Sequence, residues 1–123
     1  MHEVTVTNLT KHRVLKKELE QAGRKILRRL NKQGSISVLI VMTAKITALN
    51  QRYRKRSGST DVLSFDLSDD SEVAGEIVIS WPEAQKLAHE KNKPVKNALL
   101  YLLIHGILHL AGFEHEGVAA SRA

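Results

Sequence analysis

The segment from Leu99 to Leu110 constrains the fold of this chain more than any other part of the sequence. It is almost purely aliphatic, yet it carries His105 and His109, four residues apart. On a helix this spacing places two imidazoles on one face, one turn apart. The segment is too short to span a membrane, so it predicts a buried core helix. Burying two imidazoles in such a helix is unfavourable unless a partner satisfies their nitrogens.

A third histidine completes a pattern typical of metal sites. Gly112 can end the helix in a left-handed conformation, so that the chain doubles back and brings His115 toward the other two histidines. A lone histidine on an apolar helix is usually a hydrogen-bonded core residue, but three at this spacing are unusual. Three imidazoles leave an open position on zinc, where a bound water has a pKa near 7. We therefore expect one zinc ion per chain, although nickel or copper would accept the same ligands.

The spacing His-x3-His-x2-Gly-x2-His is also that of metzincin proteases, but two parts of those enzymes are missing. Metzincins place a glutamate directly after the first histidine as general base and need a methionine turn downstream. Here Gly106 follows His105, and both methionines, Met1 and Met42, lie upstream. Peptide hydrolysis is therefore disfavoured. A phosphodiester, which needs electrostatic assistance more than a carboxylate base, is a better substrate for such a site.

Three blocks of the sequence resemble the YbeY family of metal-dependent endoribonucleases. The segment from His105 to His115 resembles the family signature HGxLHLxG[YF][DE]H. The two other blocks comprise Leu49-Asn50 with Tyr53-Arg54 and Thr60–Phe65, and the segment Gly75–Ser80. The resemblance extends from about Val38 to His115, with the blocks in the family's order and spacing.

The resemblance implies a zinc-dependent endoribonuclease directed at single-stranded RNA. It further implies a cytoplasmic role in ribosomal RNA maturation, at the small-subunit 3′ end and in ribosome quality control, with small-subunit rRNA or a pre-ribosomal particle as partner. Arg54 matches an arginine that the family treats as essential, and a guanidinium can hold a phosphate bidentately. Candidates for orienting the ligand imidazoles are Asp61, Glu76 and Glu114.

The chemical step and two other functions stay open at this point. No general base stands out, so attack by zinc-bound hydroxide and attack by the RNA's own 2′-hydroxyl are both compatible with the sequence. One alternative function is a ribosome-biogenesis factor that binds RNA with little catalytic activity. Another is a metallohydrolase of a different bond.

Three departures from the family pattern are visible. Only Glu116–Ala123 follow His115, so we expect the acidic helix that ends other family members to be absent here. Asp66 stands where the family often has proline, and Glu76 replaces a common aspartate.

Composition favours a polyanionic partner. The formal net charge is +6, and basic residues cluster at Lys16-Lys17, from Arg24 to Lys32 and from Arg52 to Arg56. Such clusters are usually solvated helix faces, but the third lies in a block that resembles the family. There are no cysteines, which excludes disulfides and cysteine-zinc sites and is compatible with the cytosol. Most of the five aromatic residues are expected in the core, so RNA recognition should depend on phosphate contacts and shape.

The hydrophobic pattern predicts a single α+β domain over residues 1–123. The resemblance implies a mixed four-stranded sheet in a zincin-like arrangement, in which the C-terminal core helix carries the metal. Strands are expected at Glu3–Asn8, Ser35–Met42, Asp61–Phe65 and Gly75–Ser80. Helices are expected over Lys11–Asn31, from Thr43 with Ile46, Leu49 and Tyr53 inward, from the capping box Ser80–Glu83 to about Lys91, and from Pro94.

Overall fold

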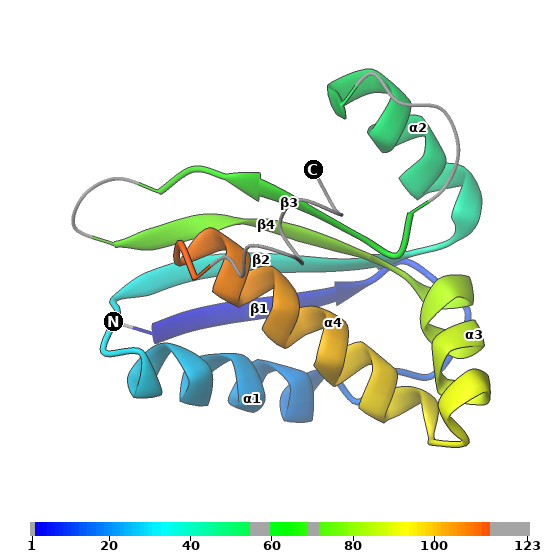
Figure 1. Ribbon diagram of the computed structural model, residues 1–123, viewed down its shortest axis with the longest axis horizontal. Helices are drawn as coiled ribbons and strands as arrows, with labels where there is room; N and C mark the ends of the chain where they lie inside the picture. The colour runs from blue at the N-terminus through cyan, green and yellow to red at the C-terminus, as the bar shows by residue number, and fades with distance from the viewer. Residues whose placement is uncertain (1, 55–59, 69–71, 114–123) are drawn as a thin grey trace.

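The part of the chain that the structure describes forms four strands and four helices. The strands carry alternating apolar residues, and the helices pack through apolar faces. The computed structural model describes residues 2–54, 60–68 and 72–113 (Figure 1). The elements in chain order are β1 (His2–Asn8), α1 (Lys16–Arg29), β2 (Gly34–Val41), α2 (Thr43–Arg54), β3 (Val62–Asp66), β4 (Val73–Ser80), α3 (Trp81–Lys91) and α4 (Val95–Leu110). The predicted α+β class and the mixed four-stranded sheet are confirmed.

The sheet has the strand order β1-β2-β4-β3. Strand β1 is parallel to β2, with Val4 opposite Ile36, and β2 is parallel to β4, with Val38 opposite Ile77. Strand β3 runs antiparallel to β4 and forms one edge of the sheet. At the other edge, the backbone N–H of Val6 donates to the Glu20 carboxylate at 2.9 Å, which occupies a hydrogen-bonding group that β1 would otherwise present to another chain.

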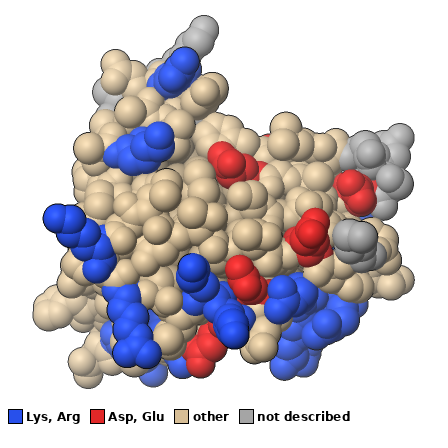
Figure 2. All heavy atoms as spheres, turned by 180° about the vertical axis from the view of Figure 1, so that it is seen from behind, with Lys and Arg blue, Asp and Glu red and all other residues tan. Residues whose placement is uncertain are grey.

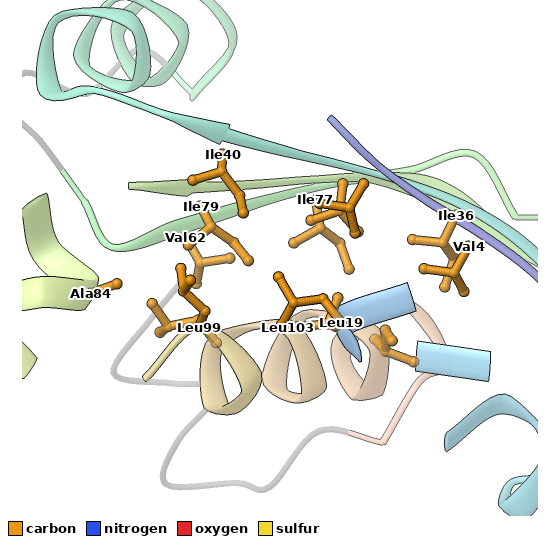
Figure 3. Close-up of a cluster of buried hydrophobic side chains, with 14 of the residues drawn as sticks. Val4, Leu19, Ile36, Ile40, Val62, Ile77, Ile79, Ala84, Leu99 and Leu103 are labelled. Carbon is orange, nitrogen blue, oxygen red and sulfur yellow. The ribbon is translucent and has the colours of Figure 1, made fainter. Parts of the chain in front are cut away.

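The main hydrophobic core lies between one face of the sheet and helices α1, α3 and α4. Figure 3 shows Ile77 and Ile79 pointing from the sheet toward α4, where Leu99 and Leu103 meet them, while Ile36 lies beside Val4 farther along the sheet. Helix α2 covers part of the opposite face, and Ile46 packs there in a second, smaller cluster with Leu63 and Val78. The segment from Leu99 to Leu110 is thus the core helix that its composition predicts.

The first helix is shorter than predicted at both ends. Its expected start at Lys11 is wrong, because the Asn8 side chain forms a turn there: it accepts from the Thr10 N–H at 2.9 Å and donates to the His12 carbonyl at 2.7 Å. The predicted end at Asn31 lies two residues beyond the observed one. The helix ends at Arg29, and Asn31 takes the left-handed conformation with φ 55°.

Two predicted helix starts are confirmed by their geometry. The N–H of Glu83 donates to Ser80 Oγ at 3.3 Å, so α3 begins with the expected cap and has a proline in its first turn. Pro94 is the residue that precedes α4. No helix in the described ranges is long and apolar enough to cross a membrane.

The sheet requires glycine at position 75, because a Cβ there would lie 2.5 Å from the Phe65 carbonyl oxygen and 3.0 Å from the Leu110 side chain. Gly75→Ala must therefore push β3 or α4 away from β4. We expect a loss of about 3 kcal/mol in the free energy of unfolding, measured by urea denaturation. Ser35→Ala, on the exposed part of β2, is the control and should change stability by less than about 0.5 kcal/mol. Equal stability of the two variants would contradict this packing.

Candidate metal centre

Two of the three predicted ligands lie on the last two turns of α4. His105 and His109 are one helical turn apart, so their imidazoles share a flank of the helix. His105 is half-buried and His109 is exposed. The expectation that both rings are buried is therefore wrong, because this flank of α4 faces away from the core contacts of Leu103 and Gly106. His105 and His109 each take part in at least one hydrogen bond, ring contact or electrostatic interaction.

A tight turn reverses the chain directly after the histidines. The N–H of Gly112 donates to the His109 carbonyl at 3.1 Å, and that of Phe113 donates to the Leu108 carbonyl at 2.9 Å. With Gly112 at φ 85°, these two bonds form a Schellman motif, which confirms the left-handed end predicted at this glycine. His115 lies outside the described residues, and the described residues alone contain no group of three side chains suited to a metal. The three-histidine site therefore stays a prediction.

Helix α4 sits close to the sheet at the level of the histidines. A Cβ on Gly106, the residue after His105, would lie 2.9 Å from the Ile77 side chain. The absent glutamate of metzincins is thus replaced by a residue whose lack of a side chain lets the helix approach β4. Gly106 therefore supplies no general base, but it sets the distance between the sheet and the part of α4 that carries His105 and His109.

Asp66 is an acidic neighbour of the histidines that the sequence did not assign to the site. Hydrogen bonds from Ser68 lower the pKa of its carboxyl below 3.8, and the charge of His109 lowers it further, against a small opposing effect of burial. The backbone N–H of Ser68 donates to Asp66 Oδ1 at 2.8 Å. The only signal in the sequence was that Asp66 occupies a position where the family often has proline.

Helices α2 and α4 lie on opposite faces of the sheet, and Tyr53 of α2 and His109 of α4 both face residues at one end of edge strand β3. Phe65 and Asp66 are consecutive and point to opposite faces. The Phe65 ring meets the Tyr53 ring edge-on at 5.6 Å, next to the backbone of Arg54, while Asp66 faces His109. The end of β3 is therefore where the two predicted functional segments converge.

The three candidates for orienting the imidazoles lie elsewhere or cannot be placed. Glu76 points to the face opposite α4, because its neighbours Gly75 and Ile77 are the residues that contact Leu110 and Gly106. Asp61 precedes β3, and its carbonyl accepts from the Ser80 N–H at 2.9 Å, at the end of the strand opposite Asp66. Glu114 lies outside the described residues.

The expectation that most aromatic rings are buried is wrong. Tyr53, Tyr101 and Phe113 are 59%, 54% and 48% exposed, so Tyr53 does not point inward as its spacing on α2 suggested. The Tyr101 ring is stacked on His105 at 6.2 Å, one turn before it on α4. The spacing Tyr101, His105 and His109 is four residues each, and this pattern could have identified the tyrosine in the sequence.

Basic side chains lie around the face seen in Figure 2. Lys and Arg gather along α1 and stand on α2, while Asp and Glu lie between them over the sheet. The described basic residues of α1 and α2 are Lys16, Lys17, Arg24, Lys25, Arg28, Arg29, Lys45 and Arg52. This distribution fits a polyanionic partner that contacts the rim of the molecule rather than the middle of the sheet.

Comparison with known proteins places the chain among endoribonucleases. The family profile described as endoribonuclease YbeY matches residues 4–122. The chain is 38% identical to the endoribonuclease YbeY of Persephonella marina over 109 residues, covering 84% of this chain and 71% of that protein. It is 39% identical to that of Koribacter versatilis over 111 residues, covering 84% of this chain and 72% of that protein.

A solved structure has the same fold. The solution structure of TM1509 from Thermotoga maritima is 32% identical and aligns with a TM-score of 0.69. The match covers 91% of this chain and 74% of that one.

Proposed function

This chain belongs to the endoribonuclease YbeY family, and from that premise we propose that it is a zinc-dependent endoribonuclease acting on single-stranded RNA in ribosomal RNA maturation. The substrate in this proposal is small-subunit rRNA or a pre-ribosomal particle, and the place of action is the cytoplasm. The family assignment carries the activity, which is hydrolysis of RNA phosphodiester bonds. The geometry at the end of α4 is the observation that supports a metal.

The donor set at the end of α4 fits a zinc ion. His105 and His109 present two imidazoles from one flank of a helix, and the turn at Gly112 reverses the chain immediately before His115. In the proposal these three histidines hold the ion. A bound zinc supplies a Lewis acid and lowers the pKa of a coordinated water to about 7.

The other residues have separate roles in the proposal. The Arg54 guanidinium holds the phosphate that is cleaved and offsets the charge that develops on it. Gly106 seats α4 against Ile77, so that the imidazoles keep a fixed height above the sheet. The Asp66 carboxylate faces the flank of α4 that carries His109, and its negative charge suits a cation held there.

Metal removal tests the proposed function directly. Purified protein should cleave a single-stranded RNA and leave the matched duplex uncut, and EDTA should abolish cleavage because the histidines then have no ion to hold. Added zinc should restore the activity. Cleavage is measured by gel electrophoresis of end-labelled RNA. Protein that contains zinc but leaves RNA uncut, both alone and with ribosomal particles, would contradict the proposal.

A further inference from the structure

A pocket of about 440 Å³ opens at the end of α4 that is remote from the histidines. We call it the tryptophan pocket; its lining residues are Arg13, Val14, Leu15, Leu19, Trp81, Val95, Lys96 and Leu99. Lys96 precedes His109 by 13 residues on the same helix, which corresponds to about 20 Å along the axis. The pocket is therefore a separate place in the molecule and takes no part in the chemistry proposed above.

The pocket holds a buried hydrogen-bond donor without a partner. Trp81 is only 7% exposed, and no acceptor among the described residues bonds to its indole Nε1. Such a buried N–H group is unfavourable unless an acceptor reaches it, and nearly all buried donors in proteins have one. The exposed His12 ring stacks on the indole at 4.5 Å with an interplanar angle of 11°, so the ring is held in a fixed orientation. The Nε1 atom is shielded from solvent, so a ligand in the pocket can supply the missing acceptor only by shifting the indole.

All polar side chains that line the pocket are donors. Arg13 and Lys96 are cations, Trp81 offers only an N–H, and the remaining lining residues are aliphatic. Leu15, which precedes α1, and Val95, the first residue of α4, both line the pocket, and neither helix start is capped by a side chain of the described residues. Their first N–H groups add positive potential. A ligand for this site has an apolar body, several acceptors and a negative charge.

One acidic residue, Glu18, competes with an anionic ligand for Lys96 at the rim of the pocket. The Glu18 carboxylate lies 3.5 Å from Lys96 Nζ, and both side chains are about half exposed. This ion pair is weak because water screens it. An incoming anion can therefore replace Glu18 as the partner of the Lys96 ammonium with little loss of free energy.

We infer that the tryptophan pocket binds one nucleotide of an RNA strand, with the base against the apolar lining and a phosphate at Arg13 and Lys96. The inference rests on the proposed function, because that function makes RNA the ligand. A nucleotide combines a flat, largely apolar base that carries acceptors with a phosphate that suits the two helix starts. The basic residues of α1 continue from the pocket along the molecule, which fits a chain of phosphates better than a peptide with one carboxylate.

Trp81 is the only tryptophan, so its fluorescence reports on the pocket alone. A short single-stranded oligoribonucleotide with 2′-O-methyl groups should change the emission of the wild-type protein on binding. The double variant Arg13→Ala/Lys96→Ala should bind about tenfold more weakly, and the slope of log affinity against log salt should fall by about 0.7, the value for one phosphate on a single strand. Glu18→Gln, which frees Lys96, should bind more tightly than wild type.

Lys86→Ala/Lys91→Ala is the matched control, since it removes two exposed α3 cations that neither line the pocket nor belong to α1. It should retain most of the affinity and the full change in emission. RNA binding without a change in Trp81 emission, or equal losses in both double variants, would overturn the inference. So would a response to an acidic peptide with an apolar C-terminus and none to RNA. A response to RNA in a protein that never cleaves RNA would support the pocket and refute the proposed function, so the two failures are distinguishable.

Discussion

His109→Ala should abolish both zinc binding and RNA cleavage. Wild-type protein purified without a histidine tag is expected to contain close to one zinc per chain, and the variant close to none. Two imidazoles cannot hold zinc as three do, and the acidified water is lost with the ion. His109 is exposed, so its removal leaves no cavity in the core and the variant should fold. Elemental mass spectrometry measures the metal, and circular dichroism measures the fold.

His89→Ala is the control for that variant, because His89 is an exposed histidine on α3, away from the end of α4. It should retain the metal and the activity. A folded His109→Ala protein that keeps one zinc per chain would refute the three-histidine site. A wild-type protein that binds no zinc, even when zinc is added, would refute the metal-dependent reaction altogether.

Arg54→Ala should slow cleavage by about 10²–10³-fold in kcat, the loss typical when one donor to a developing negative charge is removed. Zinc content and the free energy of unfolding should stay almost unchanged, because Arg54 is the last residue of α2 and is not one of the proposed metal ligands. Arg54→Lys should recover only part of the rate, since an ammonium cannot hold a phosphate bidentately. Single-turnover cleavage of end-labelled RNA measures the effect.

Arg52→Ala is the matched control for Arg54→Ala. Its guanidinium lies over the Tyr53 ring at 5.6 Å on the same turn of α2, so it tests whether any charge there suffices. It should reduce the rate only slightly. Equal losses in Arg52→Ala and Arg54→Ala would remove the special role of Arg54. A wild-type protein that binds pre-ribosomal particles but cuts nothing would favour the alternative of an RNA-binding factor.

The sequence predicted the order and type of the elements because each carries its own periodicity. The alternation in β1 and β2 and the cap at Ser80 are local, and the structure confirms them. Predictions failed where two local signals competed. At Asn8 the side chain forms a turn that delays α1 to Lys16, although the apolar stripe alone permitted an earlier start.

Burial could not be predicted from the stripes alone. Tyr53 lies in register with Ile46 and Leu49 on α2, yet α2 covers only part of its sheet face and leaves Tyr53 exposed. For His109 the aliphatic surroundings suggested burial, but the histidines lie on the flank of α4 that faces away from its core contacts. Which flank of a helix is covered depends on its neighbours, which a single segment does not encode.

The sequence by itself determined the family, the three histidines with their spacing, the turn at Gly112 and the excess of positive charge. These features are short-range patterns that are complete within a few residues. Only the tertiary structure decided that Asp66 faces His109, that Glu76 points to the opposite face, and that Tyr53 meets Phe65 at the same end of β3. It also decided that the starts of α1 and α4 meet beside Trp81. Those relations depend on strand pairing and on which face of the sheet each helix covers, and both are set by contacts between segments far apart in the chain.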